Sequence, residues 1–236
     1  MSSSQNESLI TLFKSSDLWV VNKPPRKHFD ELLTQGDEWE AVHRLDFETS
    51  GCLLFAPIER AKELRTRFKD SNLVKKLYWA GANKALESQW LSASGVRGII
   101  GSRYRSSKKV KFSQNPKDFQ GYHSKQEVFH KVRLISENEK MEFLSQGDLS
   151  PENLKIAEQL FEYCYEIELV SGARHQIRAF FEHLKNPLKG DPVYGNAGEI
   201  SFAESNAEDK GGRLALHAYK LEMSLEKVSA MAPWIP

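Results

Sequence analysis

The sequence predicts an α+β fold built on a mixed sheet, and three observations support this prediction. Short apolar runs with strand-like patterns recur along the 236 residues. Segments with helical periodicity lie among them. The two kinds of segment do not alternate strictly, as they would in a doubly wound parallel sheet.

The predicted strands are apolar or alternating segments that end at a turn signal. The first (LWVVN) ends at Lys23-Pro24-Pro25, and a later one (YCYEIELV) ends at Ser171-Gly172. The predicted strands are Leu18–Asn22, Cys52–Ala56, Leu73–Ala82, Glu127–Ile135, Tyr163–Val170 and Leu214–Met223.

The predicted helices show apolar residues at helical spacing. Ala61, Leu64 and Phe68 recur at that spacing, and Ser150-Pro151 is typical of a helix start. The predicted helices are Glu59–Lys69, about 151–161, and His175–Leu184.

Composition excludes several classes of protein. No apolar run approaches the ~18 residues that a membrane helix needs, and the start MSSSQNESL lacks the regions of a secretory signal. We therefore expect a cytoplasmic protein with residues 1–8 as a disordered tail. Cys52 and Cys164 form no CxxC pair and are expected to be buried, reduced thiols. The seven histidines are scattered without ligand spacing, so no metal site is expected.

Charge is unevenly distributed although the net charge is only +1. No Asp or Glu occurs from Ser88 to Lys117, a stretch rich in Ser and Gly that is typical of an extended loop or hairpin. A one-signed segment predicts a phosphate-binding surface, and a solvated basic loop without a partner fits the charge equally well. Its cations are Arg97, Arg103, Arg105, Lys108, Lys109, Lys111 and Lys117.

The densest polar cluster is Val42–Gly51, with the sequence VHRLDFETSG. It precedes a predicted buried strand, and functional residues favour loops held by such rigid elements. Taken alone, Asp46 fits a turn or cap as well as a chemical role. Thr49-Ser50-Gly51 also fits a simple tight turn.

Three more polar clusters follow along the chain. Arg174 and Arg178 are four residues apart at a predicted helix start and can share a face, whereas His175 can simply satisfy local backbone groups there. Lys189–Gly195 (KGDPVYG) is typical of a turn. His217 lies on an otherwise apolar strand and is by default a satisfied core histidine.

Together these clusters resemble the RluA-type pseudouridine synthases. HRLDFETSG matches the HRLDxxTSG signature of that family, which is specific, while GDxxYG and LHA alone are weak. The matching segments, in family order, are VNKP at 21–24, HRLDFETSG at 43–51, KLYWA at 76–80, HQIR at 175–178, GDPVYG at 190–195 and LHA at 216–218.

The resemblance runs from about residue 17 to the C-terminus and implies a fold and a function. The expected fold is a pseudouridine synthase-like catalytic domain over residues 9–236, with a central mixed, largely antiparallel sheet, flanking helices and no S4 domain. The expected protein is a monomer that isomerises uridine in structured RNA, either rRNA or tRNA. It is expected to use no cofactor or metal and to bind no membrane.

The resemblance also implies roles for individual residues. Asp46 corresponds to the essential aspartate, Arg178 to the basic residue paired with it, and Tyr78 to the tyrosine that stacks on the target base. Arg44 corresponds to an arginine that helps to fill the space left by the flipped base. RNA contacts are expected from Arg44, Arg174, Arg103, Arg105, Lys108, Lys109 and Lys111.

The reaction accounts for these residue types. It breaks the N1–C1′ bond of uridine and joins C5 to C1′, so it needs no redox cofactor. A carboxylate can attack the sugar or remove a sugar proton, and in either case an arginine beside Asp46 favours its charged form. The base must leave its stack first, which calls for an aromatic face and a gap-filling side chain.

Two other functions remain open at this point. The first is a catalytically silent RNA-binding protein on the same scaffold, against which the intact Asp46, Tyr78 and Arg178 argue. The second is an unrelated hydrolase that pairs Asp46 with Glu48, although nothing in the sequence marks Glu48 as a partner.

The chain also departs from the family pattern. Asn22 replaces the aspartate of V-D-K-P, and Arg174 stands one position later than the arginine of G-R-T-H-Q. The segment from about 137 to 162 is longer than usual and carries its own helix. These departures bear on the identity of the substrate more than on the chemistry.

Overall fold

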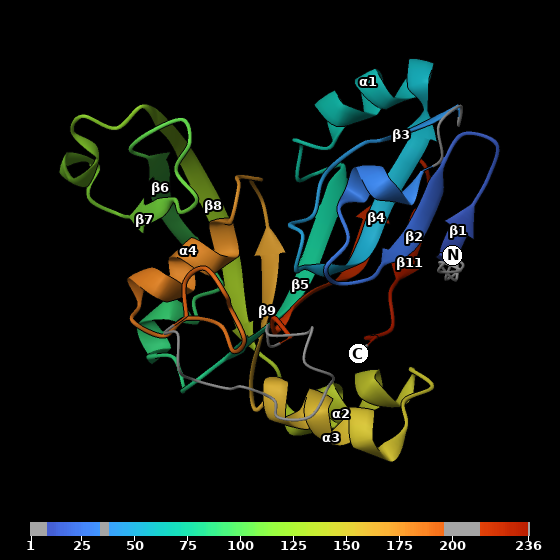
Figure 1. Cartoon of the computed structure of the whole chain (residues 1–236). Helices are drawn as coiled ribbons and strands as arrows, with labels where there is room; N and C mark the ends of the chain where they lie inside the picture. The colour runs from blue at the N-terminus through green and yellow to red at the C-terminus, as the bar shows by residue number, and fades with distance from the viewer. Residues whose placement is uncertain (1–8, 34–37, 196–212, 236) are drawn as a thin grey trace, which may run out of the picture.

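One mixed sheet forms the body of the protein. The computed structural model describes residues 9–33, 38–195 and 213–235, so the expected tail at 1–8 lies outside the described residues. The strands are β1 Ile10–Lys14, β2 Trp19–Lys23, β3 Trp39–Ala41, β4 Ser50–Pro57, β5 Val74–Ala82, β6 Val96–Ser102, β7 Lys111–Ser113, β8 Ser124–Leu134, β9 Tyr163–Leu169, β10 Leu216–Met223 and β11 Val228–Met231. Their order is β1-β2-β4-β10-β5-β9-β8-β6-β7, with β3 paired to β4 and β11 to β10 (Figure 1).

The sheet is largely antiparallel, as predicted. Among the described strands, β4 and β10 form the one parallel pair, in which Ser50 faces His217 and Gly51 faces Ala218. Gly51 has a φ of 114°, and a Cβ there would collide with the backbone of Ala218. The glycine of HRLDFETSG is therefore needed so that the loop bearing Asp46 can pack against the strand bearing LHA.

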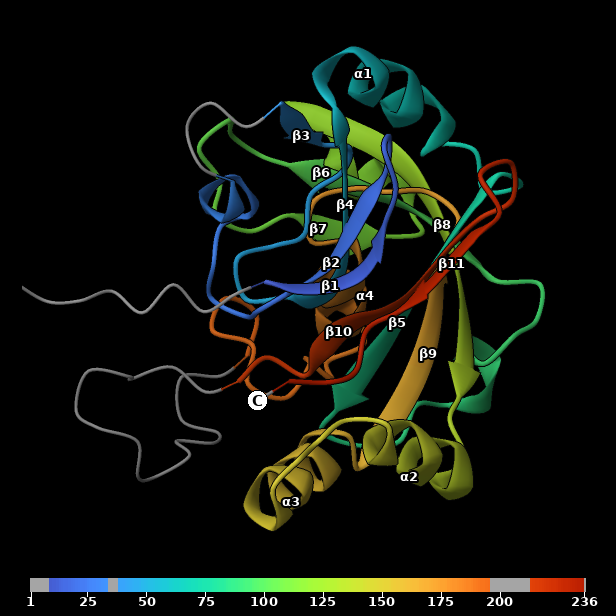
Figure 2. The ribbon, with the colours of Figure 1, turned by 90° about the vertical axis from the view of Figure 1, so that its right-hand side faces the viewer.

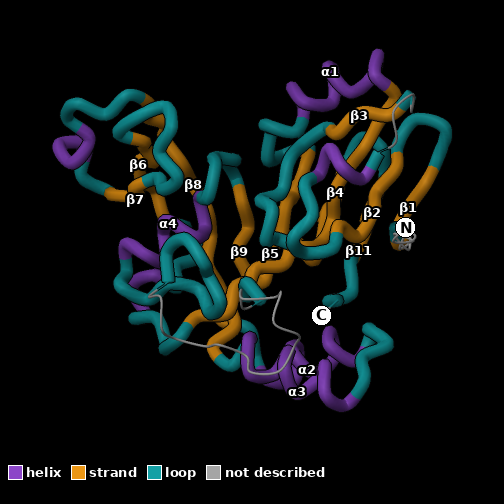
Figure 3. The backbone as a smooth tube through the Cα atoms, viewed as in Figure 1, coloured by secondary structure: helices purple, strands orange, loops and turns teal. Residues whose placement is uncertain are grey.

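The described residues form four α-helices around this sheet: α1 Ile58–Arg67, α2 Glu137–Ser145, α3 Pro151–Leu160 and α4 Gln176–His183. The helices α2 and α3 lie together at the end of the molecule opposite to α1 (Figures 1 and 2). These three helices are at the margins of the strands (Figure 3). By contrast α4 packs against β7 and beside β6 and β8, on the side of the molecule away from β1 to β4.

Both faces of β4 are buried, which explains the uninterrupted apolar run in its sequence. Leu53 and Phe55 belong to one core cluster, and Leu54 and Ala56 belong to another. Successive side chains of a strand point to opposite faces, so the two clusters lie on the two sides of the sheet here. A third cluster packs Trp79 of β5 against α2 and α3.

The predicted elements are found within a few residues of their expected ends. The described residues add three strands and one α-helix, besides the short 3-10 helices Phe29–Leu32, Ser88–Trp90 and Pro116–Phe119. The basic segment contains the antiparallel strands β6 and β7, as expected for a hairpin. The additions are β1, β3, β11 and α2. Helix α2 was missed because its buried apolar residues Phe143 and Leu144 are adjacent rather than spaced, although Ser136 and Glu139 form a capping box at its start.

Two further expectations concern cysteines and membranes. Cys52 and Cys164 are buried and unpaired, and burial raises the pKa of the Cys52 thiol to about 12. Within the described ranges, no helix is both long and apolar enough to cross a bilayer.

Candidate active site

Asp46 lies in a tight turn directly before β4. The amide of Thr49 donates a 3.1 Å hydrogen bond to the carbonyl of Asp46, which closes the turn. Lys23 Nζ, at the end of β2, donates to the carbonyl of Phe47 at 3.1 Å. The Asp46 side chain is 23% exposed, so its carboxylate is held in place and still reached by solvent.

Arg178 of α4 is the buried cation that faces this turn. Its side chain is fully buried, and its Nη1 lies 3.3 Å from Asp46 Oδ2 and 3.0 Å from Glu48 Oε2. The Asp46 turn precedes β4, whereas α4 packs against β7 at the far end of the strand order, so this contact joins the two sides of the molecule. The predicted pairing of Asp46 with Arg178 is therefore present in the geometry.

Asp191, which the sequence suggested only as part of a turn, fixes the direction of Arg178. Its carboxylate accepts two hydrogen bonds from the guanidinium, from Nε at 2.8 Å and from Nη2 at 2.7 Å. It also accepts from the amides of Val193 and Tyr194. Burial by itself would raise the pKa of Asp191, but the Arg178 hydrogen bonds and charge outweigh burial and the net pKa is lowered.

His175 stands between Asp46 and Tyr194. Its Nε2 lies 3.8 Å from Asp46 Oδ1, and its Nδ1 lies 3.1 Å from the Tyr194 hydroxyl. Burial lowers the pKa of His175; Asp46 opposes this effect, and the positive charges of Arg178 and Arg174 add to it. At neutral pH the imidazole is therefore uncharged, and Arg178 remains the main cation beside Asp46.

Tyr78 lies on β5 in the same core cluster as Leu45, the residue before Asp46. Burial, with the negative charge of Asp46 adding to it, raises the pKa of the Tyr78 hydroxyl well above its usual range. The hydroxyl thus keeps its proton at neutral pH. It can donate a hydrogen bond but cannot act as a base.

The basic hairpin, which we define as β6, β7 and the connecting residues 103–110, is tied to this site. The Tyr194 hydroxyl accepts a 2.9 Å hydrogen bond from the Val110 amide. Arg174 donates a 2.8 Å hydrogen bond to the carbonyl of Ser107. The hairpin cations predicted to bind RNA are Arg103, Arg105, Lys108 and Lys109 in the connection and Lys111 at the start of β7.

The expectation that Arg174 and Arg178 share a helix face was wrong. The helix begins at Gln176, after His175 in a left-handed conformation with a φ of 54°. Arg174 therefore precedes the helix and is exposed toward the hairpin, whereas Arg178 is buried against Asp46. Arg44 is also exposed, in the turn beside Asp46.

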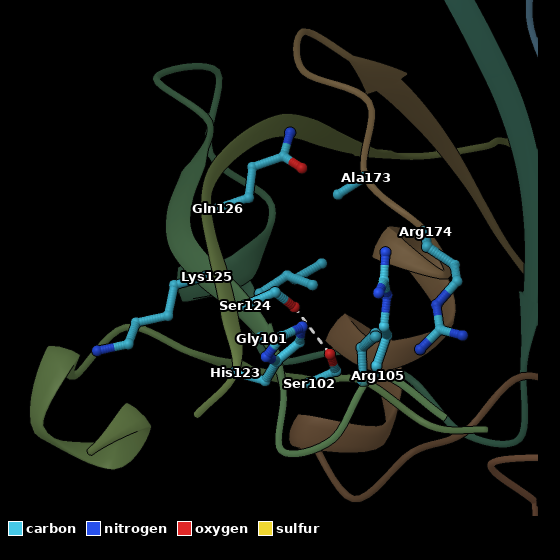
Figure 4. A pocket seen from close by; sticks show the side chains of 11 residues that line it. Gly101, Ser102, Arg105, His123, Ser124, Lys125, Gln126, Ala173 and Arg174 are labelled. Carbon is cyan, nitrogen blue, oxygen red and sulfur yellow. Dashed lines mark hydrogen bonds between the residues drawn. The ribbon is translucent and has the colours of Figure 1, made fainter. Parts of the chain in front are cut away.

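A cavity of about 400 Å³ opens beside the basic hairpin (Figure 4). Arg105, Arg174, His123 and Lys125 are among its lining residues, and none of these lining residues is acidic. The Arg105 and Arg174 side chains lie on the same side of it, while Lys125 points away (Figure 4). The cavity is thus open and positively charged, and it adjoins the loop that leads into α4.

Several site residues were not predicted from sequence. Lys23, Glu48, Asp191 and Tyr194 lie in recognised motifs, but their contacts join segments far apart along the chain. His217, in contrast, has the expected role of a satisfied core histidine, with Nδ1 2.8 Å from Ser50 Oγ and Nε2 2.9 Å from the Ala232 carbonyl. Over the part of the chain that the structure describes, there is no group of three or more His, Cys, Asp or Glu side chains suited to a metal.

Comparison with known proteins places this geometry in context. A family model described as RNA pseudouridylate synthase matches residues 15–183. An uncharacterized RNA pseudouridine synthase of Helicobacter pylori J99 is 26% identical over 225 residues, 94% of this chain and 74% of the relative. Ribosomal large subunit pseudouridine synthase D of Neisseria meningitidis serogroup B is 29% identical over 199 residues, but the match spans only 44% of that relative and 81% of this chain.

One more relative and one solved structure are also similar to this chain. The dual-specificity RNA pseudouridine synthase RluA of Vibrio cholerae is 24% identical over 223 residues, 92% of this chain and 74% of the relative. The solved structure of human RNA pseudouridylate synthase domain containing 1 has a TM-score of 0.65 at 22% identity, and the match covers 99% of this chain and 86% of that one. The second similarity concerns the fold alone, and it agrees with the predicted α+β architecture.

Proposed function

The chain belongs to the RNA pseudouridylate synthase family, and from this premise we propose that it isomerises uridine to pseudouridine in structured RNA, with Asp46 as the chemical group. The resemblance to the RluA type, a group of isomerases, is confirmed by the family match and by the named relatives. The observation that carries the proposal for Asp46 is its contact with buried Arg178, which Asp191 in turn holds in place.

The geometry supports a division of roles. Arg178 stabilises the Asp46 carboxylate and directs it, since a buried guanidinium held by two parallel hydrogen bonds has little freedom. Asp46 then either attacks C1′ or removes a sugar proton, the N1–C1′ bond breaks, and C5 joins C1′. The proton on C5 is lost once the C5–C1′ bond has formed, and N1 gains a proton in exchange. Asp46 is regenerated, either because C5 displaces it from C1′ or because it returns the sugar proton.

Tyr78 supplies the face for the flipped base in this proposal, because it shares a core cluster with Leu45, the neighbour of Asp46, and the Asp46 charge acts on its hydroxyl. Arg44, exposed beside Asp46, fills the space that the base leaves. Positive charges of the basic hairpin and of Arg174 hold phosphates, and Arg105 and Arg174 both line the cavity of about 400 Å³.

The substrate and setting belong to the same proposal. One relative is named as a ribosomal large subunit enzyme, which supports rRNA as the substrate class, and tRNA remains the other expected class. We propose that residues 9–236 act as one catalytic domain, since a single sheet includes both β1 and β11. A monomer in the cytoplasm remains the expected form.

Tritium release tests the proposal. Purified protein is mixed with unmodified rRNA and tRNA transcripts that carry uridine labelled with tritium at C5. Isomerisation replaces the C5 hydrogen and should release tritium to water. A silent RNA-binding protein would release none, and a hydrolase using Asp46 and Glu48 would give free uracil and an abasic site; either result would overturn the proposal.

A further inference from the structure

We propose that Phe47 and His28 form a stacking platform for a base in the RNA strand next to the target uridine. This inference rests on the proposed function and extends it, because it identifies how the strand is held on the side of the site away from the basic hairpin. The platform consists of the phenyl ring of Phe47 and the imidazole of His28.

Phe47 is a large apolar side chain that is partly exposed to solvent beside the Asp46 carboxylate. Its neighbours Asp46 and Glu48 both contact Arg178, while Phe47 itself is 39% exposed. The exposed His28 ring packs against it, with ring centroids 4.7 Å apart and planes inclined by 41°. Two aromatic rings thus lie together next to Asp46 and Glu48.

Hydrogen bonds to the backbone hold the two segments of the platform in place. Buried Lys23 donates hydrogen bonds from Nζ to the carbonyl of Phe47 at 3.1 Å and to that of Lys27 at 2.7 Å. These bonds connect the turn carrying Phe47 to the segment carrying His28. The Glu31 carboxylate also accepts from the His28 amide at 3.3 Å. Both backbones are fixed before RNA binds, so little ordering cost remains for binding itself.

A nucleotide base is the ligand that fits this position. Flipping the target uridine unstacks the bases beside it, and an exposed aromatic face one residue from Asp46 can replace a lost stacking partner. Stacking on aromatic side chains accepts any base. The sheet order separates β2 and β4, which carry the platform, from β6 and β7 by β10, β5, β9 and β8. The hairpin and the platform would then hold the strand from two sides.

Substitutions of Phe47 separate stacking from apolar contact. Phe47→Leu keeps an apolar side chain without a ring, and Phe47→Tyr keeps the ring. Leu225→Ala is the control, because it alters another exposed apolar residue, in the β10–β11 turn. Thermal unfolding confirms that each variant is folded. The kinetic probe is the mixture of tritiated rRNA and tRNA transcripts, and the binding probe is a dodecauridylate compared with an abasic chain of equal length.

With Phe47→Leu, KM and the Kd for dodecauridylate should both rise about 5- to 150-fold, the range that loss of one base stack gives. The value of kcat should change less than about threefold, since stacking on a neighbouring base serves ground state and transition state alike. Phe47→Tyr and Leu225→Ala should match the wild type. Affinity for the abasic chain should be the same in all variants.

The outcomes that overturn the platform are distinct from failure of the proposed function. The platform is overturned if Phe47→Leu keeps the wild-type KM and Kd, or if Phe47→Tyr is as impaired as Phe47→Leu. It is also overturned if the wild type binds both oligomers equally or binds neither. A platform meant for a protein partner would also leave these constants unchanged. Wild-type protein that prefers the base-bearing oligomer but releases no tritium would refute the isomerase and leave the stacking site standing.

Discussion

The buried pair of Arg178 and Asp191 allows activity and stability to be separated in one experiment. Both side chains are fully buried, and two hydrogen bonds of 2.7 and 2.8 Å join them. The perturbation is a cycle of three variants: Asp191→Asn, Arg178→Met and the double variant. Asparagine keeps the size of Asp191 and an oxygen for the amides of Val193 and Tyr194, and methionine approximates the apolar stem of Arg178.

The expected free energies follow from which charge is left buried and unpaired. Removing one partner of a buried ion pair costs about 3–5 kcal/mol of unfolding free energy. Arg178→Met leaves Asp191 without a cation and should fall in this range. Asp191→Asn should cost about 3 kcal/mol of unfolding free energy, the lower end of this range, because Asp46 and Glu48 still contact Arg178. The cost does not fall further, because these two carboxylates are partly exposed and compensate the buried charge only in part. The double variant removes both the Arg178 and the Asp191 charge from the buried pair, so it should be more stable than either single variant.

Urea unfolding and tritium release measure the two properties on the same proteins. The double variant should be stable yet inactive, because Asp46 has lost the guanidinium that directs it. Asp191→Asn should keep some activity, since Arg178 is still present but less well oriented. A double variant less stable than both single variants would refute the ion-pair reasoning, and one with wild-type tritium release would refute the role of Arg178.

Three further predictions follow from the same structure. Replacing the hairpin lysines Lys108, Lys109 and Lys111 with Ala should flatten the salt dependence of RNA binding, by about 0.7 in slope per lost phosphate contact for single-stranded RNA. The same change at the exposed Lys62, Lys69 and Lys75 should leave that slope unaltered. Tyr78→Phe should slow tritium release less than about tenfold, because a proton-transfer role would cost about 100-fold or more; a larger loss would contradict a purely stacking role. Burial lowers the pKa of His43 and of His217 to about 3 and that of His130 to about 4, so the unfolded chain takes up protons first as pH falls below about 6.5. Urea unfolding should therefore show this stability complete above that pH and falling below it by about 4 kcal/mol per pH unit, about 1.4 for each histidine. Equal stability at pH 7 and pH 5 would contradict this.

The sequence predicted those parts of the site that lie within continuous motifs. HRLDFETSG placed Asp46 in a loop before a buried strand, and HQIR placed Arg178 on a helix, so their pairing could be expected from the family resemblance. Asp191 was missed because its partner Arg178 lies 13 residues away on another element. Only the packing of the turn that follows α4 brings the two together.

Elements and residues without a local signal were the ones that the sequence left out. Strand β1 at the sheet edge is mostly exposed, so it lacks the apolar alternation of a half-buried strand. Lys23, which the sequence marks only as the end of a strand before two prolines, is buried because three backbone carbonyls converge on its ammonium group. Such convergence depends on tertiary packing, and no periodicity or spacing records it.

Comparison of the wild type with Asp46→Asn is the most direct test of the proposed chemistry. Asparagine keeps the size and polarity of Asp46 and removes its negative charge. Tritium release from C5-labelled rRNA and tRNA transcripts should fall by about three orders of magnitude or more, while RNA affinity should change little, because phosphate contacts and stacking supply most of it. An Asp46→Asn variant that releases tritium at the wild-type rate would contradict the assignment of Asp46.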